Sequence, residues 1–172
     1  DGNTPLYVAC RQGHFNVVKW LTENGADVNA PNNDGATPLM AAIQWERVEI
    51  VYWLAENGAD VNIATNFGLT AMCHAATRDF VDGIRVLVNY GADLNGADSN
   101  GYTPLLLAAR DNHLVTIDWL MSNGADVHAV ADRRDALCWI MSARIHQIHK
   151  VIVRLILAGA SLQPQHETES PK

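Results

Sequence analysis

The sequence is short of cysteine and has no long apolar run. Its three cysteines, Cys10, Cys73 and Cys138, lie far apart in apolar stretches and form no Cys-x-x-Cys pair. Separated thiols in an odd number are typical of buried free cysteines in a reducing compartment. The sequence also has no Asn-x-Ser/Thr sequon, no signal peptide and no run of about 18 apolar residues. We therefore expect an intracellular protein, cytoplasmic or nuclear, with no membrane insertion.

Positive charge is scarce over most of the chain. From Asp1 to Asp132, six Lys and Arg residues stand against sixteen Asp and Glu, whereas from Arg133 to Lys172 six stand against three. An acidic body repels phosphate backbones, so we expect no nucleic-acid partner. The acidic excess is typical of a solvated outer face, although a basic peptide would also suit it as a partner.

Repetition is what the chain has in abundance. Residues 24–29 read Asn-Gly-Ala-Asp-Val-Asn, and close variants return at 57–62, 90–95 and 123–128, each 33 residues after the last. A weaker copy at 158–162 comes two residues late, which predicts a small insertion in the last unit. A fixed period of this length predicts stacked units in one elongated domain rather than one closed core.

Each unit has the pattern of a helical hairpin. In the first, Thr4 and Pro5 are typical of a helix start, so we predict a helix to about Arg11. A second helix is predicted from about Phe15 to Asn24, with Gly25 ending it. The predicted units are residues 1–33, 34–66, 67–99, 100–132 and 133–162, followed by a disordered tail at 163–172. Because the chain opens on Asp1 within a turn, we expect a fragment of a longer protein.

Two features of the second helices bear on packing between units. Gly83 takes a helical position where the first two units have Val17 and Ile50, and glycine in a helix costs roughly 0.5–1 kcal/mol relative to alanine. We therefore expect unit three to be the least stable. The in-phase aromatic residues are predicted to form a ladder between units: Trp20, Trp53 and Trp119, with Val86 between the last two.

The motif Gly-x-Thr-Pro-Leu, or a close variant, opens four units, and Gly-Ala-Asp-Val-Asn or a variant ends them. With these motifs, residues 1–162 resemble the ankyrin-repeat family. The resemblance implies an all-α repeat solenoid, an ankyrin-like stack of about five helix-turn-helix units with outward β-hairpin loops. It also implies a monomeric protein–protein interaction module, a scaffold or adaptor without a cofactor, that binds a protein or peptide.

The resemblance further implies where a partner binds, since the family uses its finger loops and the concave ends of its inner helices. Carried over position by position, this surface comprises Arg11, Gln12, Asn33, Ala36, Gln44, Trp45, Asn66, Leu69, Arg78, Tyr102, Arg110 and Asp111. Trp45, Leu69, Arg78 and Tyr102 are its candidate anchors, because aromatic residues and arginine carry most interface energy. Alternatively, Trp45 only covers a gap left where Glu46 replaces a glycine.

A modification is implied at three asparagines. Asn29, Asn62 and Asn95 each follow an acidic residue by two positions and a leucine by eight. This is similar to the pattern by which an asparaginyl hydroxylase acting on hypoxia-inducible factor recognises ankyrin repeats. The alternative, compatible with the first, is a turn residue that bonds its own loop. We expect Asn95 to be the preferred target.

Other kinds of site are weaker or missing. His146 and His149 lie near Cys138, but the set lacks a fourth ligand and any zinc spacing, so we expect no metal. His14 and His113, at the break between the paired helices, are interpreted as structural hydrogen-bonding residues. No nucleophile with a base, phosphate loop or paired carboxylates occurs, so we expect no enzyme activity.

Two other functions stay open at this point. One is a groove that binds a small nucleotide-like ligand, which needs basic residues near Trp45, where only Arg11 and Arg78 are available. The other is a regulatory array attached to an enzyme or channel.

Overall fold

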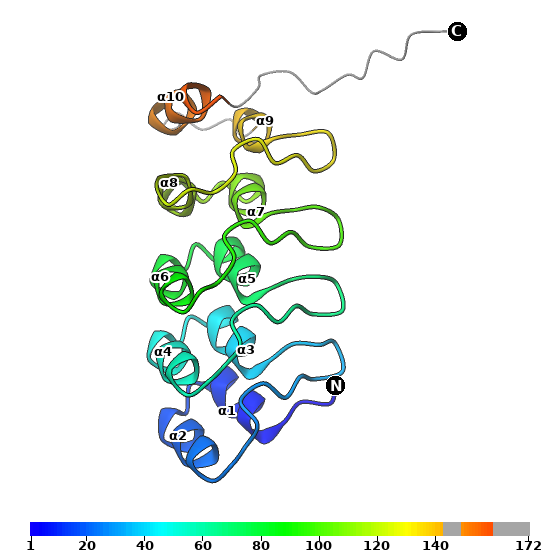
Figure 1. The fold of residues 1–172 in the computed structure, drawn as a ribbon, viewed down its shortest axis with the longest axis vertical. Coiled ribbons are helices and arrows are strands. Elements are labelled where there is room, and N and C mark those ends of the chain that lie inside the picture. The colour runs from blue at the N-terminus through cyan, green and yellow to red at the C-terminus, as the bar shows by residue number, and fades with distance from the viewer. Residues whose placement is uncertain (143–148, 160–172) are drawn as a thin grey trace, which may run out of the picture.

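The computed structural model describes residues 1–142 and 149–159, which form ten α-helices stacked in pairs (Figure 1). The inner helices are α1 (Pro5–Gln12), α3 (Pro38–Gln44), α5 (Ala71–Thr77), α7 (Pro104–Arg110) and α9 (Ala136–Ser142). The outer helices are α2 (Phe15–Glu23), α4 (Val48–Glu56), α6 (Val81–Asn89), α8 (Leu114–Ser122) and α10 (His149–Leu157). The predicted all-α repeat solenoid is confirmed. The predicted insertion and tail lie largely outside the described residues.

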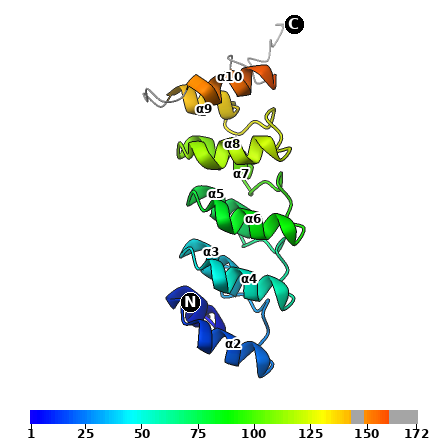
Figure 2. The same cartoon turned by 90° about the vertical axis from the view of Figure 1, so that its left-hand side faces the viewer.

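The pairs follow one another along the long axis, with α1 and α2 at one end of the stack and α9 and α10 at the other (Figures 1 and 2). Outer helices form one side, inner helices the middle, and the loops between units project on the other side as fingers (Figure 1). None of the helices in the described part of the chain has the length and apolar character that a membrane span needs.

A threonine side chain begins each of the first four inner helices, as the sequence predicts. The hydroxyl oxygens of Thr4, Thr37, Thr70 and Thr103 accept hydrogen bonds of 3.1–3.4 Å from the backbone N–H three residues on. Asp135 does the same for α9, accepting from the Cys138 N–H at 2.9 Å. These side chains satisfy donors that the helix itself leaves unpaired, which explains why every described unit has a capping residue before its inner helix.

The fingers are hairpin turns rather than paired strands. In the second finger, the backbone N–H of Asn32 donates to the Ala36 carbonyl at 2.9 Å, and the Asn32 side-chain oxygen accepts from the Asp34 and Ala36 N–H groups. Over residues 1–142 and 149–159 the only β-pairs are two isolated bridges, so the expected β-hairpin loops lack strands. Neighbouring fingers are joined by single backbone bonds, such as Asn66 N–H to the Asp34 carbonyl at 2.9 Å.

The apolar core is one continuous cluster along the stack. Each inner helix contributes a buried leucine or methionine, and the outer helices contribute branched side chains that face the neighbouring units; the set includes Leu6, Leu39, Met72, Leu105, Leu137, Val18, Val51, Ile84 and Ile117. Alanines at repeated positions of the inner helices, such as Ala42, Ala76 and Ala109, are fully buried. Small residues there let successive inner helices approach closely.

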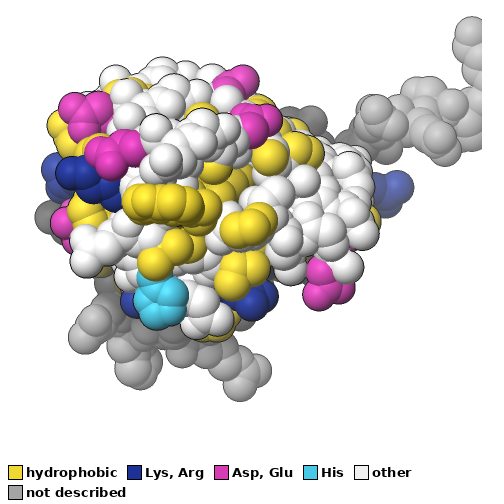
Figure 3. All heavy atoms as spheres, turned by 90° about the horizontal axis from the view of Figure 1, so that it is seen from below, with side chains coloured by type: hydrophobic (Ala, Val, Ile, Leu, Met, Phe, Trp, Pro, Cys, Tyr) yellow, Lys and Arg dark blue, Asp and Glu magenta, His cyan; other side chains and the backbone are white. Residues whose placement is uncertain are grey.

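The predicted tryptophan ladder is only partly present. The Trp53 indole packs edge-on against Phe15 of the preceding unit, with ring centroids 5.8 Å apart, and its N–H donates to the Thr22 hydroxyl at 3.0 Å. The Lys19 ammonium lies 5.3 Å from the centre of the same ring. Trp20, by contrast, is 61% exposed, so among the described residues the ladder does not extend to it. No described unit lies on the N-terminal side of α2 to cover it, and apolar side chains gather on this end of the molecule (Figure 3).

Gly83 is a site of close approach rather than an unfilled position. A Cβ atom at residue 83 would lie 2.4 Å from two ring carbons of Phe80 and 3.0 Å from the Ile43 methyl of the preceding unit. Because residue 83 has no side chain, the Phe80 ring can pack against α6. Glycine therefore serves the packing of unit three, and it is no longer a reason to expect this unit to be the least stable.

Gly83→Ala should destabilise the fold. Overpacking of a buried position typically costs about 1–3 kcal/mol, which outweighs the roughly 0.5–1 kcal/mol that alanine gains over glycine in a helix. We expect a net loss of about 1–2 kcal/mol in the free energy of unfolding, measured by urea denaturation followed by circular dichroism.

The matched control for this variant is the same substitution in a Phe80→Ala background. Without the aromatic ring the main clash is gone, so Gly83→Ala should lose most of its effect there. A Gly83→Ala chain more stable than the native one would show that helix propensity dominates at this position.

Candidate functional site

The residues expected to bind a partner occupy two columns along the stack. The helix-end column consists of the residues at the C-terminal ends of the inner helices: Arg11, Gln12, Gln44, Trp45, Arg78, Arg110 and Asp111. The finger column consists of Asn33, Ala36, Asn66, Leu69 and Tyr102. The columns meet in unit four, where the Arg110 guanidinium lies 5.4 Å from the centre of the Tyr102 ring. We call the two columns together the candidate surface.

Trp45 is the most prominent side chain of the helix-end column. It directly follows α3, and 48% of its surface is exposed. The next residue, Glu46, has a φ of 55° where unit one has Gly13, so the turn after α3 keeps the left-handed geometry without glycine. The chain thus presents a large apolar ring to solvent at a position where the other described units carry Gln12, Arg78 and Asp111.

Arg78 joins two units as well as lying on the surface. Its Nε donates to the Gln44 carbonyl at the end of α3 at 3.1 Å, a favourable place for a cation because helix C-termini carry partial negative charge. His113 has the matching contact one unit later, with Nε2 3.1 Å from the Thr77 carbonyl, as expected for a structural histidine. His14 is instead exposed and its side chain makes no capping hydrogen bond at the start of α2, so the same role is not seen for it. Part of the Arg78 guanidinium is therefore committed to holding the stack.

Tyr102 is not the exposed anchor that the sequence suggests. It is only 7% exposed, its hydroxyl donates to the Asp132 carboxylate of the next finger, and its ring contacts Trp139 with centroids 6.2 Å apart. This hydrogen bond, together with burial, raises the pKa of Tyr102. Leu69 and Ala36 are half-buried. Of the finger column, Asn33 and Asn66 remain exposed, and they are linked by a bond from the Asn66 amide to the Asn33 carbonyl at 3.0 Å.

Phe67 is an exposed finger residue that the sequence reasoning missed. It lies at the turn of the third finger with 64% of its surface exposed, and its carbonyl accepts from the Ser99 N–H at 3.0 Å. The signal was present in the sequence. The same turn position holds Asp34 in the second finger and Asn100 in the fourth, so a phenylalanine there departs from a polar pattern.

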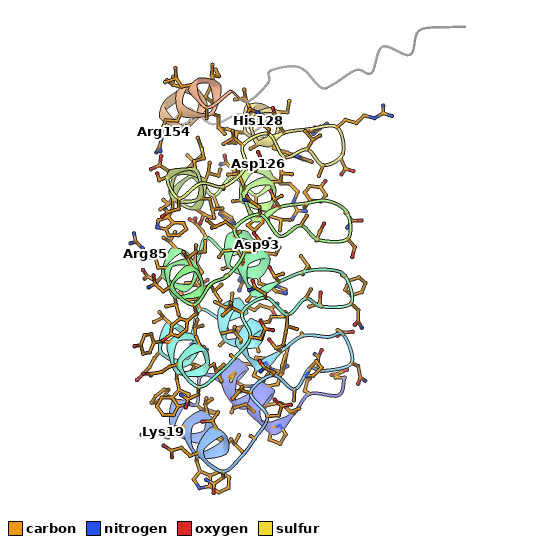
Figure 4. All side chains as sticks on the ribbon, viewed as in Figure 1. Lys19, Arg85, Asp93, Asp126, His128 and Arg154 are labelled. Atoms are coloured by element: carbon orange, nitrogen blue, oxygen red, sulfur yellow. The ribbon has the colours of Figure 1, made fainter. Side chains whose placement is uncertain are left out.

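Most of the acidic excess lies on the outer side of the stack, although the fingers carry Asp34, Asp98 and Asp132, and Glu46 and Asp79 follow the inner helices. Nine acidic residues of the first four units lie on the outer helices or the loops that follow them: Glu23, Asp27, Glu49, Glu56, Asp60, Asp82, Asp93, Asp118 and Asp126. Only Lys19 and Arg85 balance them on those segments (Figure 4). In the helix-end column Arg11, Arg78 and Arg110 instead outnumber Asp111, which pairs with Arg110 at 3.1 Å.

A family model described as ankyrin repeats in three copies matches residues 1–65 and again residues 57–131. These matches cover most of the chain. The chain belongs to the ankyrin-repeat family. A search of curated proteins finds no matching relative. Ankyrin repeats are generally protein–protein interaction modules and typically not enzymes.

In the loops that follow the first three outer helices, asparagine side chains join consecutive ankyrin units. The Asn29 amide donates to the Gly58 carbonyl at 3.1 Å, and its oxygen accepts from the Asp60 N–H at 2.8 Å. Asn62 makes the same two bonds to the next unit, to Gly91 and Asp93. The bond within each loop is made instead by aspartate, as when Asp27 accepts from the Asn29 N–H at 2.9 Å. The asparagines are therefore inter-unit links, contrary to their interpretation as residues that bond their own loop.

The series of asparagine links changes toward the C-terminus. The Asn95 oxygen accepts from the Asp126 N–H at 2.8 Å, but its amide nitrogen donates to no acceptor among residues 1–142 and 149–159. His128 takes the next position of the series, beside Gly159 of the last unit (Figure 4). Asn95 is thus held by one bond where Asn29 and Asn62 are held by two.

The cysteines of the ankyrin stack have the chemistry of core residues. Cys10 and Cys73 are buried, and burial raises the pKa of Cys10 to about 12 and also raises that of Cys73. A thiol with such a pKa forms almost no thiolate near neutral pH. Within the described ranges, no cluster of three or more His, Cys, Asp or Glu side chains could hold a metal. Of the histidine pair considered above, His146 lies outside the described residues.

His74 is a titratable residue of the inner helix α5. It lies in α5 at a position held by Ala41 and Leu107 in the neighbouring units, and burial lowers its pKa below 6.5. The folded chain therefore binds a proton at His74 less readily than the unfolded chain does. The stability associated with neutral His74 is complete above pH 6.5 and is lost as the pH falls below that value.

We expect the urea midpoint of the native chain to fall between about pH 7.5 and about pH 5.5, and His74→Leu to reduce that fall. Leucine is the matched replacement because unit four has Leu107 at this position. The exposed His14→Gln variant serves as the control and should keep the native pH dependence. An equally steep pH dependence in His74→Leu would assign the titration to other groups.

Proposed function

We propose that this chain is an adaptor or scaffold module that binds a peptide or protein partner on the candidate surface, extended by Phe67. The observation that carries the proposal is the pair of exposed aromatic side chains in neighbouring units, Trp45 and Phe67. Aromatic residues that interrupt a polar pattern are the usual anchors of protein interfaces. Arg11, Gln12, Gln44, Asn33 and Asn66 are the exposed or half-exposed polar groups proposed to surround them.

The charge of the helix-end column supports a partner with an acidic rather than a basic segment. Arg11, Arg78 and Arg110 lie in this column, where Arg110 forms an ion pair with Asp111, while Arg11 and Arg78 form no ion pair with a described carboxylate. Opposite charges across an interface favour encounter and fix orientation. The basic peptide considered from overall composition would be suited to the outer helices, where the acidic residues lie.

A groove for a small nucleotide-like ligand has less support. Arg11 and Arg78 are the basic residues available near Trp45, and the Arg78 Nε is already bonded to the Gln44 carbonyl. A regulatory array joined to an enzyme or channel would use the same surface as an adaptor. The identity of the bound partner separates these two functions.

Trp45→Ala and Phe67→Ala should each weaken partner binding by about 2 kcal/mol, or roughly thirty-fold, because anchor residues carry most of the interface energy. The measurement is quantitative mass spectrometry of proteins that the immobilised chain retains from a cell extract, followed by titration with the retained protein. Circular dichroism should remain native, because both side chains are largely exposed.

Trp20→Ala is the matched control, since it removes an exposed indole outside the candidate surface. It should retain the same proteins as the native chain. If Trp45→Ala and Phe67→Ala also retain them unchanged, the candidate surface is not where the partner binds.

We also propose Asn95 as a site of side-chain hydroxylation. Asp93 and Leu87 supply the flanking pattern, Asn95 is exposed, and one hydrogen bond rather than two holds its side chain. A less restrained asparagine opens more readily toward an enzyme.

After incubation with the asparaginyl hydroxylase that acts on hypoxia-inducible factor, we expect intact mass spectrometry to detect one added oxygen atom. Fragmentation should assign it to Asn95 before Asn29 or Asn62, and Asn95→Ala should remove that first addition. No added oxygen on Asn95 in the native chain would end this proposal.

A further inference from the structure

Five Asn-Gly pairs occur in the chain, at residues 24–25, 57–58, 95–96, 100–101 and 123–124. An asparagine that precedes glycine can lose its side-chain amide without an enzyme, because the glycine backbone nitrogen reaches the asparagine side-chain carbonyl and no Cβ hinders the approach. The folded chain decides which pairs can react, since hydrogen bonds can hold the two reacting groups away from each other. One of the five pairs differs from the others in this respect.

Three of the pairs end an outer helix, and both of their reacting groups are bonded. The side-chain amides of Asn24, Asn57 and Asn123 donate to helix carbonyl oxygens four residues earlier at 2.7–2.8 Å. The backbone N–H groups of the glycines that follow them donate to carbonyl oxygens three residues earlier at 3.2–3.4 Å. In the fourth finger, the Gly101 N–H donates to the Asp98 carbonyl at 2.9 Å, so the nitrogen that would attack Asn100 is bonded as well.

Neither reacting group is held in this way at Asn95 and Gly96. Within residues 1–142 and 149–159, the Asn95 amide nitrogen donates to no acceptor, and the Gly96 backbone N–H donates to none either. The one bond of the exposed Asn95 side chain comes from the Asp126 N–H to its carbonyl oxygen at 2.8 Å. A donor on that oxygen stabilises the negative charge that develops there when the carbonyl carbon is attacked. The link between the units therefore favours the reaction instead of preventing it.

Gly96 also distinguishes Asn95 from the other two linking asparagines. Ala30 follows Asn29 and Ile63 follows Asn62, and their side chains hinder attack by the backbone nitrogen. The fold does not require glycine at residue 96, because this glycine is not among those with a positive φ. A Cβ atom there would come no closer than 3.4 Å to the Asp93 carboxylate, which is an ordinary contact.

We propose that Asn95 is a site of spontaneous deamidation, which over time breaks the side-chain link between units three and four. The Gly96 nitrogen loses its proton to hydroxide and attacks the Asn95 side-chain carbonyl carbon. The bond from that carbon to the amide nitrogen breaks, ammonia leaves, and a succinimide ring is formed. Water then opens the ring at either carbonyl to give aspartate or isoaspartate, so the reaction consumes water, releases ammonia and needs no oxidant or cofactor.

Either product places a carboxylate where Asn95 had a neutral amide. Asp93 and Asp126 lie on the two loops that this residue joins (Figure 4), and the Asp93 carboxylate already accepts from the Asn95 N–H at 2.8 Å. The new charge is therefore close to charges of the same sign. Isoaspartate also draws the former side-chain carbonyl into the main chain and lengthens it by one methylene. Both changes weaken the junction between α6 and α8.

Peptide mapping by mass spectrometry of the folded 172-residue chain, aged in mildly alkaline buffer without any enzyme, tests the proposal. We expect Asn95 to exchange its NH2 for OH at least about tenfold faster than the other four sites, because their bonded groups must first be released. In a chain aged in urea, the five rates should become similar, since the protecting bonds are gone. Because no enzyme is present, this test is separate from the test of hydroxylation.

Gly96→Ala is the matched variant, since unit one has Ala30 at this position and a Cβ atom fits. It keeps Asn95 and its bond to Asp126, so the urea midpoint of the fresh variant should be native while its deamidation falls to the rate of the other sites. Asn95→Asp imitates one product directly, and its urea midpoint should lie below that of the native chain.

The proposal is wrong if Asn95 deamidates no faster than the other Asn-Gly sites of the folded chain. It is also wrong if the lead of Asn95 persists undiminished in urea, or if a folded Gly96→Ala variant deamidates at the native rate. An Asn95→Asp chain as stable as the native one would contradict the weakening of the junction.

Discussion

Burial between neighbouring units is the constraint on which the rest of this structure depends. Its helices have seven to nine residues, and helices of that length are marginal in water on their own. Each one is stable because its apolar side is covered by the units before and after it, through residues such as Leu39, Leu105 and Ile117. The stability of any one unit is therefore a property of its contacts and not of its own sequence alone.

Polar links repeat with the same step as the core and keep the units in register. The Asn29 and Asn62 amides, the Arg78 contact to α3 and the single bonds between fingers each join one unit to the next at exposed or half-exposed places. A hydrogen bond contributes only about 0.5–1.5 kcal/mol, less where water competes. These links are directional, unlike apolar contact, so they select one stacking geometry among many that would bury similar area.

The features that could be predicted from sequence are the local and repeated ones. The Thr4 cap, the limits of the helices and the glycine turns each depend on a few adjacent residues, and repetition in four units makes their signal clear. What could not be predicted depends on how individual side chains pack, either within a unit or against the next one. Tyr102 is buried because Asp132 follows it in the next finger, and Gly83 is needed because Phe80 and Ile43 occupy its space. Neither pairing recurs, so the repeat pattern gives no sign of it.

This distinction separates two kinds of exposed apolar residue. Trp45 and Phe67 are exposed because they depart from the repeat, standing where the other units have polar side chains. Val17 and Trp20 conform to the repeat and are exposed only because nothing among the described residues stacks on them. A side chain that departs from the repeat has no role in stacking the units. It is therefore available to bind a partner that is not itself an ankyrin unit. A residue that conforms to the repeat, but on which no described unit stacks, has the shape and chemistry to pack against one more unit of the same kind. Exposure alone would assign Trp45 and Trp20 the same role, and comparison with their counterparts in the other units assigns them different ones.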